Sequence, residues 1–382
     1  MLRTSQPPLL SVKTLGDYVQ TDGGYTRATS IIYNSPTPNP YQFTDRSIEA
    51  LTNMLESHTD PAADRAWAFV GPYGSGKSTF TRLFAGLIEK PGFQQTQTSD
   101  VVNTENGVWT ENARHHLGSR NPELLEQLTE VQEKYLITRT LANTGSVQAD
   151  LYRELFHLLS TLSPRSKLVT ELREKLSNPI ENPDVLSAVT DVLQIISKTG
   201  KAEGLTIIID EFGRLLMGSE EDANRSMALI QDLAELANSS RHPSLNLIVL
   251  LHQNFTDYAS RLGKSRRNDW KKIQGRFRQQ NFQENPMQLF ALIKDQLRST
   301  LPATAWSKHV RKECTGVGVA NSVKDYLVDV GNLFPLHPMA ALALPVLSAR
   351  VGQNERTLFS FLSSREPFSL RDFLNSKLLI II

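Results

Sequence analysis

The chain has 382 residues, of which 40% are hydrophobic and 21% charged, so it can bury a sizeable core in two or three packed units and does not resemble a disordered chain. Its 41 lysines and arginines nearly balance its 40 aspartates and glutamates, which excludes polyanion binding through the overall charge and leaves only local nucleic-acid sites. The single cysteine, Cys314, excludes an internal disulfide, and the sequence shows neither a secretory signal nor a bilayer-length apolar run, so we expect a soluble cytoplasmic protein.

The first predicted element is a helix in the sequence YQFTDRSIEALTNML, residues 41–55. Thr44 or Asp45 is suited to cap this helix, and its apolar residues recur at helical spacing. We expect residues 1–62 to form an N-terminal segment and this helix, which together precede the core.

A glycine-rich stretch, GPYGSGKST at residues 71–79, separates a buried strand predicted at 67–70 from a helix that ends before Pro91. It satisfies the pattern G-x-x-x-x-G-K-[ST], and a strand before the loop with a helix after it is the setting that a phosphate-binding loop requires. The residues that satisfy the pattern are Gly71, Gly76, Lys77 and Ser78. The alternative is a glycine and serine loop that only turns the chain.

Each part of this loop is expected to bind one part of a nucleoside triphosphate. The glycines let successive N–H groups point inward, and the helix that starts near Lys77 adds its positive dipole end. Lys77 supplies a charge at the β and γ phosphates, Ser78 offers a hydroxyl to Mg²⁺, and Thr79 offers one to the α phosphate. The residues predicted to hold the nucleotide in this loop are Gly71, Gly74, Ser75, Gly76, Lys77, Ser78 and Thr79.

The region between Pro91 and Gly204 is expected to hold an insertion and a second core strand. Residues 92–120 are polar with little periodicity, which predicts a surface excursion. A strand is predicted at 135–141. Helical patterns follow at about 148–162, 166–176 and 184–198, and we expect them to form a helical subdomain beside the sheet.

Two acids follow the next predicted strand, in GLTIIIDEF. The β-branched run at 205–209 is typical of a central parallel strand, and we expect it to be a neighbour of the strand that precedes the glycine loop. Asp210 is suited to hold Mg²⁺ through water, and Glu211 to activate the attacking water. The sequence therefore predicts a magnesium site between the loop and these acids.

Polar residues also end the strand predicted at 245–251, in the order His252, Gln253 and Asn254. Because polar side chains at the carboxyl ends of strands face the ligand crevice of an open α/β sheet, we expect Gln253 to contact the γ phosphate or the lytic water. His252 and Asn254 are alternatives for this role. The other interpretation is a cap for the following turn.

Residues 261–278 carry eight basic residues against the single acid Asp269, with Trp270 and Phe277 among them. A segment of this charge density predicts a local contact with the phosphates of DNA or another nucleic acid. The alternative is a solvated helix that joins the core to the C-terminal region.

The order of these parts resembles that of the AAA+ and STAND groups of P-loop ATPases, from about residue 41 to residue 362. In these families an arginine before the last short strand acts as an arginine finger on the γ phosphate of a neighbouring subunit. The resemblance therefore implies this role for Arg276, or for Arg278, and a homo-oligomer as the active form. The alternative is an arginine paired with a surface carboxylate.

The resemblance also implies a helical lid in FPLHPMAALALPVLSARVGQNERTLFSFL. The sequence GQNER is similar to the turn that brings a sensor arginine onto the nucleotide, which implies Arg356 in this role, with Arg350 as the alternative. The Leu-His-Pro turn at 336–338 is similar to a turn that lies against adenine. In the same families Tyr41 and Phe43 correspond to the segment that lines the adenine pocket, although aromatic residues before a helix also serve as packing residues.

The chain departs from compact members of these families in the long stretch between Lys77 and Asp210. A narrower similarity, carried by DEFG, LLHQNF, WKKIQGRF, PLHPMAALALP and GQNERTLFSFL as a set, is to the N-terminal ATPase of large bacterial proteins associated with antiviral phage defence. The final NSKLLIII would expose apolar residues, so we expect that it belongs to a longer chain.

Together these patterns predict an α/β fold: a P-loop NTPase three-layer sandwich with a parallel sheet, a helical insertion and a C-terminal helical lid. The core is expected at 63–290 with the insertion at about 92–134, and a truncated lid at 291–382. The predicted function is Mg²⁺-dependent hydrolysis of ATP, coupled to a conformational change between core and lid. The alternatives are a nucleotide-gated switch or scaffold with little turnover, and a nucleic-acid remodeller whose turnover DNA would raise.

Overall fold

The computed structural model describes most of residues 41–72, 75–93, 100–142, 147–162, 184–213, 220–253 and 272–282. It also describes residues 19–21, most of 366–376 and scattered positions elsewhere. The chain forms two compact units: Ala28–Gln283 is one, and Met1–Arg27 with Glu284–Ile382 is the other. The division into three parts at residues 62 and 290 stays a prediction.

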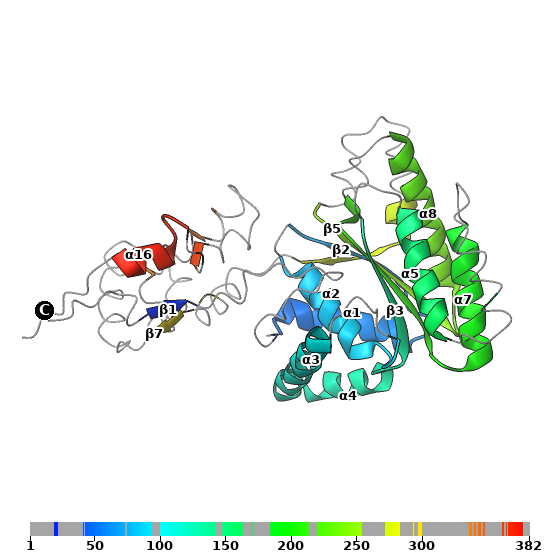
Figure 1. Cartoon of the computed structure of the whole chain (residues 1–382), viewed down its shortest axis with the longest axis horizontal. Coiled ribbons are helices and arrows are strands. Elements are labelled where there is room, and N and C mark those ends of the chain that lie inside the picture. Colours follow the sequence, from blue (N-terminus) through cyan, green and yellow to red (C-terminus); the bar gives the residue numbers. More distant parts are fainter. Residues whose placement is uncertain are drawn as a thin grey trace, which may run out of the picture. The chain divides into compact units, whose positions relative to one another are not determined.

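The centre of the first unit is a five-stranded sheet in which all paired strands are parallel (Figure 1). Its order is β3-β4-β5-β2-β6. The strands are β2 (Ala66–Val70), β3 (Tyr135–Leu141), β4 (Gly204–Asp210), β5 (Ser244–Leu251) and β6 (Arg278–Asn281). The predicted parallel α/β fold is therefore confirmed, and the carboxyl ends of all five strands lie at one edge.

The spatial order of the strands differs from the sequence-based expectation at one point. Strand β4, which carries the two acids, was expected next to β2, whereas β5 lies between them and pairs with both. The prediction of direct neighbours was wrong because hydrophobicity shows that a strand is buried, and it does not show which other strand it pairs with. The separation of β2 and β4 is two strand spacings, about 10 Å.

Helices cover both faces of this sheet and make it the middle of three layers (Figure 1). Four of them share one hydrophobic cluster with one face: α1 (Asp45–Thr59), α2 (Lys77–Ile88), α3 (Asp100–Arg120) and α4 (Pro122–Val131). Three share another cluster with the opposite face: α5 (Val147–Leu162), α7 (Val185–Thr199) and α8 (Glu220–Ser239). The three-layer sandwich is confirmed.

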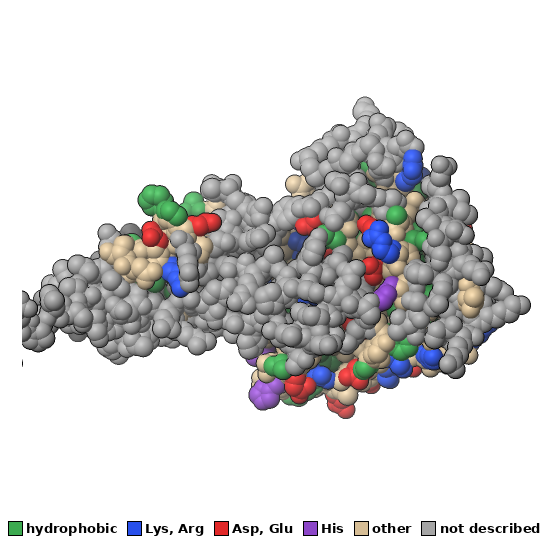
Figure 2. Space-filling view, viewed as in Figure 1, with side chains coloured by type: hydrophobic (Ala, Val, Ile, Leu, Met, Phe, Trp, Pro, Cys, Tyr) green, Lys and Arg blue, Asp and Glu red, His purple; other side chains and the backbone are tan. Residues whose placement is uncertain are grey.

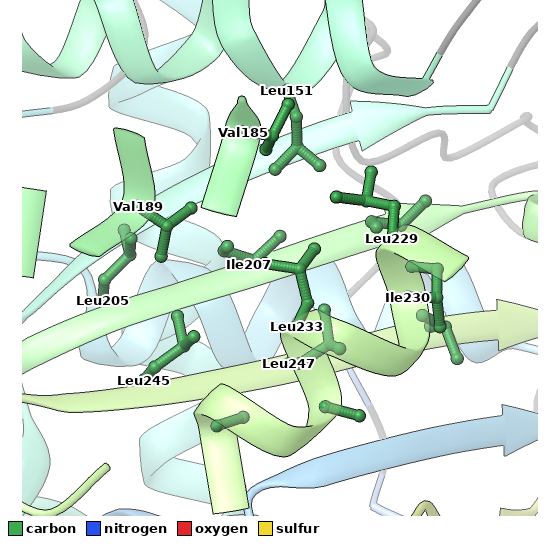
Figure 3. Close-up of a cluster of buried hydrophobic side chains, with 14 of the residues drawn as sticks. Leu151, Val185, Val189, Leu205, Ile207, Leu229, Ile230, Leu233, Leu245 and Leu247 are labelled. Atoms are coloured by element: carbon green, nitrogen blue, oxygen red, sulfur yellow. The ribbon is translucent and has the colours of Figure 1, made fainter. Parts of the chain in front are cut away.

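The central strands are hydrophobic at most positions because both of their faces are covered. All residues of β4 and β5 are buried. Figure 3 shows how Ile207 and Leu247 of these strands meet side chains of α8, such as Leu233, and how Leu205 approaches Val189 of α7. Helices α5 and α7 thus form part of the outer layer of the sandwich, instead of a separate subdomain beside the sheet.

The insertion contains a helix where the sequence predicted a polar surface excursion. Helix α3 spans 21 residues, and Trp109, Ala113 and Leu117 are buried on one of its faces. These three residues are four apart and form a narrow apolar stripe among polar residues. The prediction was wrong because so narrow a stripe gives only a weak helical periodicity of hydrophobic residues in the sequence. Helix α4 begins at Pro122 as the sequence indicated, with Asn121 as its cap.

In the second unit, β1 (Val19–Thr21) pairs antiparallel with β7 (Leu297–Ser299), and a short helix, α16 (Leu370–Ser376), follows. Hydrophobic side chains are exposed around α16 (Figure 2), among them Phe368 and Phe373. Most of the predicted lid, like the predicted helix at 166–176, lies outside the described residues. Among the residues that the structure describes, no helix is long and apolar enough to cross a membrane.

Candidate functional site

The glycine loop starts where β2 ends, between the ends of its two neighbouring strands. The backbone N–H of Gly71 donates to the carbonyl of Leu251 at 3.1 Å, and the N–H of Phe282 donates to the carbonyl of Val70 at 2.6 Å. A Cβ atom at Gly71 would stand 2.3 Å from the carbonyl oxygen of Phe282. Only glycine therefore allows the backbone at residue 71 to lie this close to the backbone of Phe282. The first residue of the loop is thus held at the carboxyl ends of the strands.

The loop ends at Gly76, which is the residue before α2. Gly76 has a φ of 82°, in the left-handed region that favours glycine, and no side chain among the described residues caps the helix there. The first N–H groups of α2 thus face the loop together with the positive end of the helix dipole. This arrangement is typical of an anion-binding helix start.

The ammonium group of Lys77 lies inside the loop. Its Nζ donates to the carbonyl oxygens of Gly71 and Pro72 and, at 3.2 Å, to Oγ of Ser75, and the side chain is buried. These contacts bring Gly71, Ser75 and Lys77 together, and the binding of a nucleotide by these residues stays a prediction. Ser78 and Thr79 are partly exposed on the first turn of α2. Gly74 lies outside the described residues.

The two acids stand where β4 leaves the sheet. Asp210 is 3% exposed, and its Oδ1 accepts a hydrogen bond from the N–H of Glu211 at 2.8 Å. Glu211 has a φ of 56°, a left-handed conformation that costs a residue other than glycine about 1 kcal/mol. Such strain at a strand end is common in functional sites and gives Glu211 a direction different from that of a regular strand residue.

The end of β5 lies between the loop and the acids. Val70 of β2 pairs with Leu251, and Ile209 of β4 pairs with Val249, so the three strands end within about two residues of each other along the sheet. Gln253 is exposed beyond this end, and His252 is partly buried. Asn254 lies outside the described residues.

No group of three or more His, Cys, Asp or Glu side chains that could hold a metal ion occurs in the part of the chain that the structure describes. A magnesium ion bound with a nucleotide needs few protein ligands, because phosphate and water oxygens supply the others. The hydroxyl of Ser78 and the buried carboxylate of Asp210 are oxygen donors of the kind that Mg²⁺ prefers. The residues therefore fit this cofactor.

The candidate finger arginines lie at the amino ends of the strands, opposite the carboxyl ends where the glycine loop and the two acids stand. Arg276 lies two residues before the start of β6 and forms an ion pair with Glu235 of α8. Its carbonyl accepts a hydrogen bond from the side chain of Asn238. Arg278 lies over the ring of Trp67, 5.1 Å from its centroid, and 3.7 Å from a carboxylate oxygen of Glu56. Neither arginine is at the carboxyl edge where its own chain's glycine loop begins.

The sequence-based reasoning missed Arg46, which lies beside the loop. Its Nη2 stands 3.8 Å from the position that a Cβ atom of Gly76 would occupy, and its guanidinium lies 4.4 Å from the ring centroid of Phe282. Arg46 is the second residue of α1, and no sequence pattern used above includes it. Only the packing of α1 beside the loop indicates it.

The aromatic residues before α1 have a packing role. Phe43 is 1% exposed and belongs to the core, and the ring of Tyr41 meets it edge-on at a centroid distance of 5.0 Å. The packing interpretation is thus supported for Phe43. The predicted sensor arginines Arg356 and Arg350 lie outside the described residues.

No family model matches the chain, and no curated protein matches it. Among solved structures, it is similar to the ORC2 protein of Aeropyrum pernix in its ADPNP-ADP complexes, with 12% sequence identity and a TM-score of 0.34. The match covers 69% of this chain and 55% of that one, so the chain spans about half the length of the structure it matches. A likeness at this level carries no functional argument, and the fold rests on the strand pairings themselves.

Proposed function

We propose that the chain binds ATP with Mg²⁺ and hydrolyses it to ADP and phosphate. The observation that supports this proposal is the convergence of three groups at one edge of a parallel sheet. These are a glycine loop with a buried lysine after β2, a polar residue after β5 and two acids at the end of β4. A crevice at the carboxyl ends of parallel strands is where open α/β sheets bind ligands.

The residues have separate tasks in this proposal. Backbone N–H groups of the loop and the ammonium of Lys77 hold the β and γ phosphates, and the hydroxyl of Thr79 holds the α phosphate. Ser78 and Asp210 hold Mg²⁺, which when bound neutralises charge that develops on the phosphates. The carboxylate of Glu211 orients the attacking water and accepts its proton, and Gln253 contacts the γ phosphate or that water.

We propose further that Arg276 acts on the site of a second copy of the chain. Its place at the amino edge of the sheet, away from its own loop, supports this geometry. The guanidinium would stabilise charge that develops on the γ phosphate across the interface. The active form would then be a homo-oligomer. Association with phage defence, and contact with DNA through residues 261–278, are proposed on the sequence alone.

The experiment that tests the main proposal is steady-state phosphate release by the purified chain with MgATP, with and without DNA. ATP binding is measured in parallel by calorimetry. Binding with turnover supports the ATPase, and binding with no phosphate release under either condition supports the nucleotide-gated switch instead. Absence of binding overturns both.

A further inference from the structure

Helix α8 holds the backbone at Arg276. The side-chain amide of Asn238, in the last turn of α8, donates to the carbonyl of Arg276 at 2.9 Å. The Oδ1 atom of the same side chain accepts the N–H groups of Arg65 and Ala66, at 2.9 Å and 3.1 Å. Asn238 therefore ties the backbone at Arg276 to the start of β2, the strand that leads into the glycine loop.

The neighbours of Arg276 in the chain also hold its backbone. The N–H of Arg276 donates to the carbonyl of Ile273 at 3.0 Å, and the N–H of Phe277 donates to the carbonyl of Gln274 at 3.2 Å. Ile273 and Phe277 are buried in the hydrophobic cluster that α8 shares with the sheet. Because the backbone is held on both sides, the guanidinium changes direction by rotation about its side-chain bonds alone.

The guanidinium of Arg276 is turned back onto its own chain. It forms an ion pair with the carboxylate of Glu235, and its Nη1 donates to the carbonyl of Lys272 at 3.3 Å. The side chain of Arg276 is 29% exposed and that of Glu235 is 51% exposed, so the pair lies at the surface and is partly covered. Both terminal nitrogens of the guanidinium thus donate within the chain.

A second carboxylate lies close to the same guanidinium. Asp232 is one turn before Glu235 on α8. Burial raises the pKa of Asp232, and the charge of Glu235 raises it further, whereas the charge of Arg276 lowers it. Arg276 therefore interacts with both acids of this turn, and Glu235 is the one that it contacts directly.

The finger role proposed for Arg276 needs the guanidinium in another place. It would have to reach the γ phosphate at the glycine loop of a second copy, because its own loop lies at the carboxyl ends of the strands. Donors that serve Glu235 and Lys272 are not available to a phosphate at the same time. The contacts within the chain therefore compete with the contact across the interface.

We propose that Glu235 restrains Arg276 in the free chain, and that assembly with a second copy releases the guanidinium onto the phosphate of the neighbouring site. The ion pair is then an autoinhibitory contact, because a chain supplies the finger only while the pair is open. This inference rests on the proposed ATPase and on the proposed finger. Since apparent affinity falls with the fraction of chains in the competent state, the pair sets the protein concentration at which turnover appears.

The first test is Glu235→Gln, which keeps the shape of the side chain and removes its charge. Phosphate release per chain is measured with saturating MgATP over a range of protein concentrations. We expect the concentration for half-maximal turnover to fall roughly two- to fivefold, the equilibrium factor of a partly exposed ion pair, with the plateau near that of the wild type. An unchanged or higher half-maximal concentration would overturn the proposal.

The matched control for this test is Glu111→Gln. It also removes an exposed glutamate that is paired with an arginine, here Arg114 within α3. Because this pair does not involve Arg276, the control should follow the concentration dependence of the wild type. A control that shifts as far as Glu235→Gln would show a general effect of lost negative charge and would overturn the specific role of Glu235.

The second test locates the effect in the subunit that supplies the finger. In a mixture of Lys77→Ala and Arg276→Ala chains, the first offers Arg276 and the second offers an intact loop. Adding Glu235→Gln to the Lys77→Ala chain should raise phosphate release roughly two- to fivefold at concentrations below the half-maximal one. Adding it to the Arg276→Ala chain should change nothing. Equal effects, or none, in the two mixtures would overturn the proposal.

Failure of the proposed function is distinguishable from failure of this inference. The wild-type chain and Arg276→Ala are measured first. A wild type that does not bind ATP rejects the site, one that binds without turnover rejects the ATPase, and wild-type turnover in Arg276→Ala rejects the finger; each of these results also removes the basis of the restraint. Where the ATPase and the finger are both supported, wild-type behaviour of Glu235→Gln rejects the restraint alone.

Discussion

At the scale of single residues, Lys77 and Glu211 are the side chains whose replacement separates binding from turnover. Lys77 is buried among oxygens of its own loop, and Glu211 is turned by a left-handed backbone at the end of β4. The lysine contributes its charge to the ground state and to the transition state, whereas the glutamate acts on the attacking water.

We expect Lys77→Ala to weaken ATP binding by about a hundredfold or more, because it removes a full charge from the phosphate site. Glu211→Gln should leave the dissociation constant nearly unchanged and lower kcat by about 10²- to 10⁴-fold, the usual contribution of a general base. Calorimetry and phosphate release measure the two effects. Equal activity of Glu211→Gln and the wild type would contradict the assignment of Glu211 as base.

His58 is a buried histidine that links α1 to the sheet. Its Nδ1 donates to the carbonyl of Met54 at 2.6 Å, so the Nε2 of the neutral ring accepts the hydroxyl of Thr206 at 3.1 Å. Burial lowers the pKa of His58 to about 4, and the nearby charge of Arg65 lowers it too, whereas the bond to Met54 raises it. The ring is therefore neutral in the folded protein at neutral pH.

This lowered pKa predicts a loss of stability in acid. The unfolded chain binds a proton at His58 near pH 6.5 and the folded chain only near pH 4, so the contribution is present above pH 6.5 and declines as the pH falls toward 4. The free energy of unfolding should lose about 2 kcal/mol between pH 6.5 and pH 5 from this group. Urea unfolding at several pH values measures it.

In His58→Gln that part of the pH dependence should disappear, even though the variant is less stable at pH 7. The control is His115→Gln, which replaces an exposed histidine on α3. In this control the free energy of unfolding should change with pH as it does in the wild type. An unchanged slope in His58→Gln would show that other groups cause the acid sensitivity.

At the scale of secondary-structure elements, a buried ion pair connects the end of α2 to β3. Glu89 follows the last residue of α2, and its carboxylate pairs with the guanidinium of Arg139 on β3. Burial raises the pKa of Glu89, although the charge of Arg139 and its hydrogen bond act in the opposite direction. The pair anchors the far end of the helix that begins with Lys77.

We expect Arg139→Met to lower the free energy of unfolding by about 3 to 5 kcal/mol, because it leaves a buried carboxylate without its partner. The double variant Glu89→Leu with Arg139→Met should recover most of that loss, since hydrophobic replacement of both partners is often close to neutral. Guanidinium or urea denaturation compares the three proteins. A double variant no more stable than Arg139→Met would show that the pair has further structural roles.

At the scale of the whole molecule, the question is whether one chain contains a complete site. The loop, Gln253 and the acids meet at the carboxyl edge of the sheet, and Arg276 lies at the amino edge beside Glu235. An arginine at that place reaches a triphosphate only if a second copy presents its own loop there. The proposed finger thus requires assembly.

We expect Arg276→Ala and Lys77→Ala each to abolish turnover alone, by about 10³-fold or more for the finger. A mixture of the two should recover part of the activity, because a Lys77→Ala subunit can offer Arg276 to the intact loop of an Arg276→Ala subunit. Phosphate release from the mixture measures this. The control is Arg153→Ala, which removes an exposed arginine paired within α5 and should be fully active. No recovery in mixed oligomers would contradict action across an interface.

The sequence by itself determined the local parts of this molecule. The helical spacing, the caps and the hydrophobic runs predicted α1, α2, α5 and the inner strands, because these elements depend on neighbouring residues. The pattern of the glycine loop gave the roles expected for Lys77 and Ser78 for the same reason. These residues are next to each other in the chain and need no distant partner to be recognised.

The tertiary structure alone decided what depends on partners far apart in the chain. It placed β5 between β2 and β4, brought Arg46 beside Gly76, and put Arg276 at the opposite edge. It also made a helix of α3, whose narrow apolar stripe gains its stability from packing against α2 and α4. Pairing order and burial are collective properties of the packed sheet, so no local pattern in the sequence can specify them.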